Sequence, residues 1–286
     1  IFHVGGLNIL TLPLLQCGWT VILQQEFEPE ETWQLMADNG VTKMFAIPTM
    51  LNMMVSVEGW QEHDLDALEL MIAGGEAVTT DLKEALQTID VPLVAAYGLT
   101  ETTDGTLFLR PEYAMEKGPK CNGKTFTHVD AKIVDENGED VPQGEEGELL
   151  HRGAVVAERY LNRPEKTDET WRDGWFHTGD IARQDEEGHY YILGRKDDML
   201  VSGGENVYPS EVEEALYSHD AVKETVVFGK PSEKWGEKVT AVIATDSDEL
   251  DETALREFLN GRIAGFKRPK EYVFTDELPK GGSGKV

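Results

Sequence analysis

Short apolar runs alternate with longer polar stretches between residues 19 and 110, and this rhythm limits the fold more than any other feature of the chain. The runs cover residues 20–23, 43–47, 70–73 and 92–96, and helix-like stretches of roughly 10–20 residues separate them. Strands that alternate with helices in this way build βαβ units around a parallel sheet. The first part of the chain is therefore predicted to be α/β.

Glycines follow two of these apolar runs, at residues 74–75 and at residue 98. In open α/β sheets, ligands bind outside the carboxyl ends of the strands. Both glycine turns are therefore candidate edges of a binding site, although a tight turn alone explains each of them equally well.

The pattern changes further along the chain. From residue 118 to residue 193, Asn-Gly, Gln-Gly, Glu-Gly and Asp-Gly turns separate short strands, which predicts hairpins in a β-rich, barrel-like subdomain. From residue 199, a helix pattern followed by strands predicts a small α+β domain. Ser210 is expected to cap that helix, with Glu213 closing a capping box. The predicted division is 1–117 for the rest of a large domain, 118–193 for its β-rich part, 194–198 as a boundary and 199–286 for the small domain.

The charge balance is strongly acidic, because Lys+Arg 26 against Asp+Glu 54 gives 26 − 54 = −28. Such a surface repels DNA and anionic lipid, so nucleic-acid binding is excluded. The same acidity is typical of proteins adapted to strong salt, and a halophilic protein is expected. The alternative is an ordinary acidic cytosolic enzyme.

The cysteine content and the apolar segments indicate a compartment. Cys17 and Cys121 are too few for a disulfide framework and are interpreted as structural. The longest apolar stretch, residues 9–23, is shorter than the ~20 residues that cross a bilayer and is predicted to be core. No export signal opens the chain. A cytoplasmic protein without a membrane span is therefore expected, and the sequence indicates no oligomeric state.

Residues 97–103, Tyr-Gly-Leu-Thr-Glu-Thr-Thr, bring nucleotide-binding chemistry to the end of a predicted buried strand. An aromatic ring can stack on a purine, and a threonine hydroxyl can donate to a phosphate oxygen. A carboxylate is a hard oxygen ligand that suits Mg²⁺. The alternative is a strand-to-helix turn in which Thr100 merely caps.

Two further patterns suit a nucleotide. Asp180 can accept two vicinal ribose hydroxyls while Arg195 donates nearby, although a surface ion pair of little worth is the alternative. Gly203 and Gly204 would let the backbone approach a ligand closely. The glycine-rich residues 279–285 lack the spacing of a Walker A motif, so a P-loop is excluded.

Taken in order, the motifs of this chain strongly resemble those of the adenylate-forming acyl-CoA synthetases (the AMP-dependent synthetase/ligase family), with fatty-acid and benzoate-type CoA ligases as similar members. The motifs are YGLTE at 97–101, TGD at 178–180, GRKDDM at 194–199, SGGEN at 202–206, WGE at 235–237 and GK at 284–285. The resemblance implies a ligase that uses ATP, Mg²⁺ and coenzyme A. Such an enzyme joins a fatty or aromatic acid to AMP, releasing pyrophosphate, and then transfers the acyl group to the CoA thiol.

The resemblance also implies a role for each matching residue on the nucleotide side. Tyr97 with Gly98 resembles the adenine-stacking element, Thr100 the phosphate ligand, and Glu101 the Mg²⁺ ligand. The remaining nucleotide-binding positions are Gly74, Gly75, Glu76, Asp180 and Arg195.

Other matches concern the acyl group, the hinge and CoA. His3 resembles a histidine near the acyl carboxylate, and Lys285 the lysine that bridges carboxylate and phosphate during adenylation. Asp197 matches the hinge about which the small, mobile domain rotates between the two half-reactions. The implied CoA-binding residues are Ser202, Gly203, Gly204, Trp235, Phe266 and Arg268.

The Ser/Thr/Gly-rich phosphate loop of the family does not occur in this chain. The chain is therefore expected to be a carboxyl-terminal portion, truncated at its end, that is inactive in adenylation when isolated. The sequence leaves two alternatives open. One is an adenylation domain that loads a carrier protein, and the other is a non-catalytic fragment that binds nucleotide.

Overall fold

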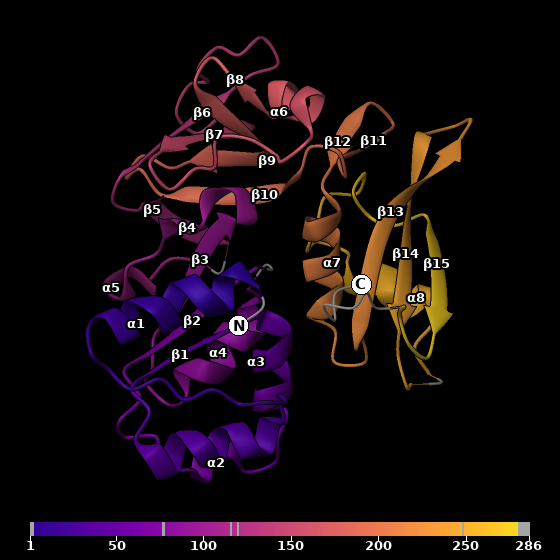
Figure 1. Cartoon of the computed structure of the whole chain (residues 1–286). Coiled ribbons are helices and arrows are strands. Elements are labelled where there is room, and N and C mark those ends of the chain that lie inside the picture. The colour runs from indigo at the N-terminus through magenta and orange to yellow at the C-terminus, as the bar shows by residue number, and fades with distance from the viewer. Residues whose placement is uncertain (1–2, 76–77, 115, 119, 248, 280–286) are drawn as a thin grey trace. The chain divides into compact units, whose positions relative to one another are not determined.

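The computed structural model describes residues 3–75, 78–114, 116–118, 120–247 and 249–279. The chain forms two compact units. The first unit comprises Ile1–Thr178 and Ala182–Ile192, and the second comprises Gly179–Ile181 and Leu193–Val286. Figure 1 shows a mixed α/β chain in which each unit is built around its own sheet.

Parallel strands begin the sheet of the first unit. β1 (Lys43–Ala46), β2 (Leu70–Gly74) and β3 (Leu93–Leu99) pair in parallel, as expected for βαβ units. The helices around them are α2 (Pro29–Asn39), α3 (Pro48–Val55), η2 (Trp60–Glu62) and α4 (Thr80–Gln87). Trp33, Leu51, Met54 and Leu82 from these helices are almost fully buried against the strands. The carboxyl ends of β2 and β3 therefore have a rigid support.

The prediction for residues 9–23 is wrong. The segment contains η1 (Gly6–Thr11) and α1 (Leu12–Gln16), and residues 20–23 form no strand within the described part of the chain. Leu15, Trp19 and Leu23 are each more than half exposed, so the segment is not core. An apolar run becomes a strand only beside a partner for its backbone groups, and no described strand pairs with this one.

Antiparallel strands continue the same sheet. Within the described residues ten strands belong to it, in the order β1-β2-β3-β4-β5-β10-β9-β7-β6 with β8 beside β9. The added strands are β4 (Asp104–Phe108), β5 (Cys121–Thr125), β6 (Val129–Val134), β7 (Gly147–Gly153), β8 (Trp171–Arg172), β9 (Trp175–Gln184) and β10 (Tyr190–Arg195). Short helices α5 (Pro111–Ala114) and α6 (Pro164–Thr170) lie in the connections. Gly138, Gly144 and Gly188 adopt positive φ at hairpin turns, as the Gly-containing turns predict.

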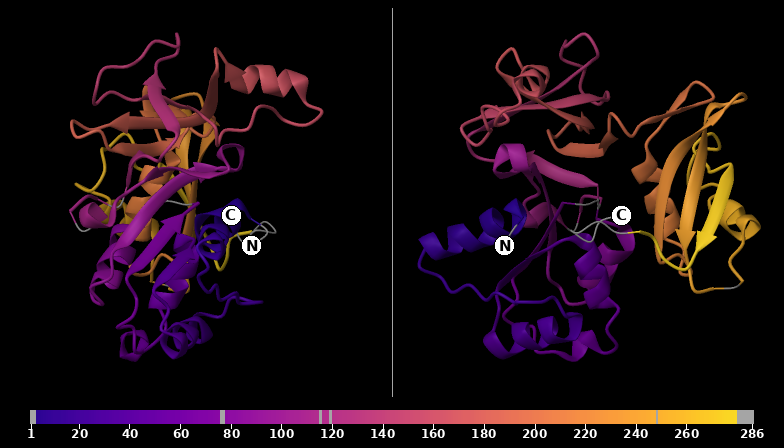
Figure 2. Two further views of the ribbon diagram at one scale, coloured as in Figure 1. Left: turned by 60° about the vertical axis from the view of Figure 1, so that its left-hand side comes forward. Right: turned by 45° about the vertical axis from the view of Figure 1, so that its right-hand side comes forward.

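The second unit is a small α+β domain. Its sheet joins β11 (Leu200–Ser202), β12 (Glu205–Val207), β13 (Glu224–Ser232), β14 (Gly236–Ala244) and β15 (Glu271–Thr275) in the order β12-β11-β14-β13, with β15 parallel to β14. The helices α7 (Pro209–Tyr217) and α8 (Glu252–Phe258) cover one face, where Leu216 and Leu255 meet Val227, Ile243 and Tyr272 (Figure 2).

The start of α7 differs from the predicted capping box. Pro209 occupies the first turn, and no side chain caps the helix. The Ser210 hydroxyl donates instead to the carbonyl oxygen of Leu193, and a Glu213 carboxylate oxygen accepts from the N–H of Val227. Both side chains therefore connect α7 to its neighbours, and burial raises the pKa of Glu213.

The described helices include none long and apolar enough to span a membrane.

Candidate functional site

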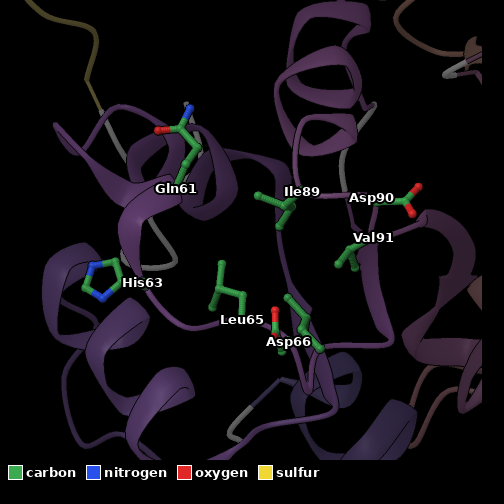
Figure 3. A pocket seen from close by; sticks show the side chains of 8 residues that line it. Gln61, His63, Leu65, Asp66, Ile89, Asp90 and Val91 are labelled. Carbon is green, nitrogen blue, oxygen red and sulfur yellow. The ribbon is translucent and has the colours of Figure 1, made fainter.

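A cavity of about 370 Å³ lies at the end of the parallel strands where β2 and β3 begin. In Figure 3, Leu65, Ile89 and Val91 point toward one another inside it. The predicted nucleotide-binding residues lie at the opposite, carboxyl ends of the strands. Because ligands of open α/β sheets bind at that end, the candidate site is placed there.

Tyr97 lies at an irregularity in the sheet. The register between β3 and β4 shifts between Tyr97 and Gly98, which changes the direction of the strand just before its end. The half-buried Tyr97 ring lies 6.0 Å from the ring of His151. The Thr106 hydroxyl is 3.1 Å from Nε2 of His151 and also donates to the Tyr97 carbonyl oxygen at 3.4 Å. Burial lowers the pKa of His151 to about 4, so the imidazole beside Tyr97 is neutral at pH 7.

The turn after β3 presents a free hydroxyl. The short helix η3 (Thr100–Thr102) is capped by Thr102, whose Oγ1 accepts from the Leu99 N–H at 2.9 Å and donates to the Leu99 carbonyl oxygen. The exposed Thr100 hydroxyl makes no hydrogen bond with any described residue. Thr100 is therefore not the capping residue, and its hydroxyl is available to a phosphate oxygen.

Glu101 is held from a distant part of the chain. Its Oε1 accepts a 2.6 Å hydrogen bond from the Tyr160 hydroxyl, and its carbonyl oxygen accepts from the N–H of Ala157 at 2.7 Å. Within the described residues no cation pairs with this carboxylate. An oxygen donor of this kind, next to the free hydroxyl of Thr100, suits Mg²⁺, which prefers one or two carboxylates together with phosphate oxygens and water.

The ring of Phe45 lies close to two segments that carry predicted site residues. A Cβ added to Gly5 would lie 3.0 Å from Cζ of Phe45, and one added to Gly74 would lie 3.4 Å from Cε2 of the same ring. His3 is exposed, and its Nδ1 accepts from the Gly5 N–H at 3.3 Å. Gly75 has a φ of 88°, which favours glycine. The Phe45 ring thus lies close to both Gly74 and Gly5, and His3 is bonded to Gly5.

In the second unit, Asp180 and Arg195 form the predicted pair. Arg195 Nε lies 3.3 Å from Oδ1 of Asp180, which is buried, while half of the arginine side chain is exposed. The Lys196 N–H donates to the Gly179 carbonyl oxygen at 2.8 Å and joins the two turns. Asp197 lies in the exposed turn that follows, between β10 and β11, and its role as the hinge stays a prediction.

Trp235 contacts the glycine turn of the second unit. Gly203 and Gly204, with φ of 65° and 87°, connect β11 to β12. The Gly203 N–H donates to the Trp235 carbonyl oxygen at 2.8 Å, and a Cβ on Gly203 would lie 3.2 Å from the Trp235 ring. The ammonium groups of Lys234 and Lys270 lie 4.7 Å and 5.6 Å from the centre of that ring. Burial, followed by the charges of nearby arginines, lowers the pKa of Lys270.

The other predicted CoA-binding residues, Ser202, Phe266 and Arg268, differ in burial and in their hydrogen bonds. Ser202 is buried, and its hydroxyl has no hydrogen-bond partner among the described residues. Phe266 is 38% exposed, and Arg268 donates to the side chain of Asn260 at 2.9 Å and to the Ile263 carbonyl oxygen. Arg268 therefore has a local structural role. Glu76 and Lys285 lie outside the described residues.

A cluster with the spacing of metal ligands lies elsewhere in the first unit. Asp185, Glu187 and His189 approach one another, but the Lys117 ammonium lies 3.2 Å from the Asp185 carboxylate and 2.7 Å from that of Glu187. Burial tends to raise the pKa of Asp185. Hydrogen bonds from the backbone N–H of His189 and from the Lys117 ammonium have the opposite effect, and together they lower this pKa to about 2. Lys117 thus joins these carboxylates in a partly exposed ion-pair network.

Sequence reasoning missed several residues at the site, namely Phe45, His151, Tyr160, Lys234 and Lys270. Each contacts a predicted residue, but most are far from it in the sequence. Lys234 is the exception, since it precedes Trp235 directly and a cation next to an aromatic residue can be seen in the sequence.

Comparison with known families agrees with this geometry. The model described as "AMP-binding enzyme" matches residues 1–161, and that described as "AMP-binding enzyme C-terminal domain" matches residues 211–285. The chain therefore belongs to the AMP-binding enzyme family, in agreement with the motifs.

Among its relatives are a feruloyl-CoA synthase of an Amycolatopsis species, 38% identical, and an indoleacetate–CoA ligase of Aromatoleum aromaticum, 39% identical. Each alignment covers 100% of this chain but 58% and 56% of those proteins, so the chain spans little more than half of their length. The structure of o-succinylbenzoate CoA synthetase from Bacillus subtilis in complex with its acyl-adenylate superimposes with a TM-score of 0.91 at 31% identity, covering 100% of this chain and 57% of that one. The predicted α/β fold is confirmed.

Proposed function

We propose that a protein containing this chain is an ATP-dependent acid–CoA ligase that prefers an aromatic acid. The observation that carries the proposal is the turn at the end of β3, where Tyr97, the free hydroxyl of Thr100 and the carboxylate of Glu101 stand together. Relatives named for feruloyl and indoleacetyl substrates are 38–39% identical, whereas a long-chain fatty acid ligase of Mycobacterium tuberculosis is 33% identical. The higher identity to relatives named for feruloyl and indoleacetyl substrates supports an aromatic acid, and relatives named for 2-succinylbenzoate, which is also aromatic, are 33% and 36% identical.

The proposed reaction has two steps. A carboxylate oxygen of the acid attacks the α-phosphorus of ATP, the bond from that phosphorus to the bridging oxygen breaks, and acyl-adenylate and pyrophosphate form. The CoA sulfur then attacks the acyl carbon, the bond to the AMP oxygen breaks, and the thiol proton is released with AMP. Tyr97 would stack on adenine, Thr100 would donate to a phosphate oxygen, and Asp180 would accept from the ribose. Magnesium bound through Glu101 would offset charge on the phosphates.

The second unit would serve the thioester step. Gly203 and Gly204 let the backbone approach the pantetheine arm, and the Trp235 ring with its two lysines offers a stacking surface and positive charge to the CoA nucleotide. In this proposal Lys285 acts only in adenylation. Rotation of the small domain about Asp197 then switches the enzyme from adenylation to thioester formation.

The length of the relatives supports a further part of the proposal. The chain would be the carboxyl-terminal portion of a longer enzyme, hereafter the full-length enzyme, with the phosphate loop in the remaining portion. That portion would cover the exposed apolar side chains of Leu15, Trp19 and Leu23. We also propose a cytoplasmic location, supported by the two free cysteines, and adaptation to salt, supported by the charge of −28.

The test separates the half-reactions in the full-length enzyme. Pyrophosphate release is measured with a panel of aromatic and fatty acids, and thioester formation is measured from supplied acyl-adenylate with CoA or with a phosphopantetheinyl carrier protein. We expect acid-dependent pyrophosphate release, preference for CoA, and loss of the first step alone in Lys285→Ala. Release without any acid dependence contradicts the ligase, and preference for the carrier protein indicates a carrier-loading domain. The isolated chain is expected to release no pyrophosphate; acid-dependent release by it would show that it contains its own phosphate site.

A further inference from the structure

The hydrogen bond between Tyr160 and Glu101 joins residues far apart in the sequence. At 2.6 Å between Oη and Oε1 it lies in the range of a charge-assisted hydrogen bond from a hydroxyl to a carboxylate. Tyr160 lies outside the motifs that resemble the family, and the proposed reaction does not use it. Because Tyr160 binds the expected metal ligand directly, it can influence how that ligand is oriented.

Tyr160 is itself held in place. Its ring meets the ring of Trp171 edge-on, with centroids 5.1 Å apart and planes at 77°. The Tyr160 N–H donates to Oγ1 of Thr167 at 3.0 Å, and Trp171 packs in turn against Phe176. These contacts fix the orientation of the Tyr160 ring. The Tyr160 side chain therefore loses little conformational freedom when its hydroxyl binds the carboxylate.

The backbones of the two segments are also joined. The Ala157 N–H donates to the Glu101 carbonyl oxygen at 2.7 Å, and the Thr103 hydroxyl donates to the Val155 carbonyl oxygen at 2.7 Å. These bonds fix the turn that carries Glu101, but they leave the rotation of its carboxylate free. Only the Tyr160 hydroxyl, among the described residues, restrains that rotation.

The restraint leaves one carboxylate oxygen for a ligand. Oε1 is engaged by Tyr160, whereas Oε2 accepts no hydrogen bond from a described residue. We propose that Tyr160 is a positioning residue for the divalent ion, because its hydroxyl holds Glu101 so that the second oxygen alone is offered. The inference rests on the proposed function, from which the metal role of Glu101 comes. Partners of a metal ligand typically contribute roughly 10–100-fold to metal affinity.

The test compares Tyr160→Phe with Tyr190→Phe in the full-length enzyme. Tyr190 is a matched control, since its buried hydroxyl also donates to an oxygen, the Ala131 carbonyl at 3.2 Å, without contacting Glu101. Mn²⁺ affinity is measured by electron paramagnetic resonance with a non-hydrolysable ATP analogue present, and melting temperature is measured in parallel. We expect Tyr160→Phe to weaken Mn²⁺ binding roughly 10-fold or more, while Tyr190→Phe keeps the wild-type affinity and both lower the melting temperature alike.

A double-mutant cycle shows whether Tyr160 acts through Glu101. In a Glu101→Gln background, Tyr160→Phe is expected to cause no further loss of Mn²⁺ affinity, because the ligand it positions is gone. Unchanged affinity in Tyr160→Phe overturns the proposal, and so does an equal loss in Tyr190→Phe or an additive loss in the double variant. Failure of acid-dependent pyrophosphate release in the wild type contradicts the proposed ligase separately, since the Mn²⁺ comparison needs no turnover.

Discussion

The carboxylate of Asp180 is 5% exposed, while the Arg195 side chain, whose Nε lies 3.3 Å away, is half exposed. The pair therefore differs from an ordinary surface ion pair, in which both groups are solvated and the contribution is small. A buried acceptor beside a partly free donor can bind vicinal hydroxyls without first losing solvation. This geometry supports the ribose-binding role that the motif implies.

The first prediction concerns AMP affinity. Asp180→Ala in the full-length enzyme should weaken AMP binding roughly 10–100-fold, because hydrogen bonds to a charged acceptor contribute about 1.5–3 kcal/mol. Isothermal titration calorimetry with AMP measures the change. Asp130→Ala is the control, because Asp130 binds Arg152 at 2.8 Å on an exposed surface. Equal losses in both variants, or none in Asp180→Ala, would contradict the assignment.

The second prediction concerns the pH dependence of stability. Burial lowers the pKa of His151 to about 4, against about 6.5 in the unfolded chain. The unfolded state therefore binds more protons between these values, and this histidine makes the free energy of unfolding fall as pH drops from about 6.5 to about 4.

Substitution of His151 should remove that slope. His151→Gln is expected to reduce the fall in the free energy of unfolding between pH 6.5 and pH 4 by up to about 3 kcal/mol. Urea unfolding of the full-length enzyme at several pH values measures this change. His128→Gln is a control at an exposed position. A slope between pH 6.5 and 4 identical in wild type and His151→Gln would show that the histidine is not protonated on unfolding.

The parallel strands could be predicted from the sequence because strands buried on both faces are continuous apolar runs. Residues 43–47, 70–73 and 92–96 have that pattern and form β1, β2 and β3. Residues 20–23 have the same pattern and form no described strand. A local pattern reports the polarity of a segment, whereas strand formation also needs a partner backbone alongside.

The candidate site shows the same limit. Tyr97 and Glu101 belong to a local motif and could be predicted, but Tyr160 reaches Glu101 only through tertiary contacts across 59 residues. The capping residue was also ambiguous, because several threonines follow one another and only the backbone geometry selects Thr102 over Thr100. Long-range hydrogen bonds and the choice among neighbouring hydroxyls both depend on the folded backbone.

The third prediction concerns CoA. Trp235→Ala should raise the KM for CoA roughly 10-fold, since stacking of a base on an aromatic ring contributes about 1–3 kcal/mol, and should leave acid-dependent pyrophosphate release unchanged. Trp175→Ala is a matched control, because its ring also lies beneath two cations, Lys132 at 5.1 Å and Arg152 at 4.4 Å. An effect of Trp235→Ala on the adenylation step alone would exclude it from the CoA site.

The fourth prediction concerns the choice of acid. Phe45 lies against Gly5 and Gly74, so Phe45→Ala should open space between these segments. We expect kcat/KM to shift roughly 10-fold toward bulkier acids, a magnitude typical for a change in a hydrophobic pocket, in a competition assay with small and large aromatic acids. Phe126→Ala, at a 57% exposed position, should leave the ratio unchanged. An unaltered ratio in Phe45→Ala would place the acyl group elsewhere.

The fifth prediction concerns salt. With a net charge of −28, repulsion among surface carboxylates should destabilise the folded enzyme in dilute buffer. The Debye length falls from about 10 Å at 0.1 M to about 3 Å at 1 M, so KCl should screen the repulsion and raise the melting temperature over this range. Glycine betaine at equal osmolality is the control, because it carries no net charge and leaves the Debye length unchanged. A melting temperature that stays flat or falls in KCl, or rises equally in betaine, would leave an acidic enzyme without adaptation to salt.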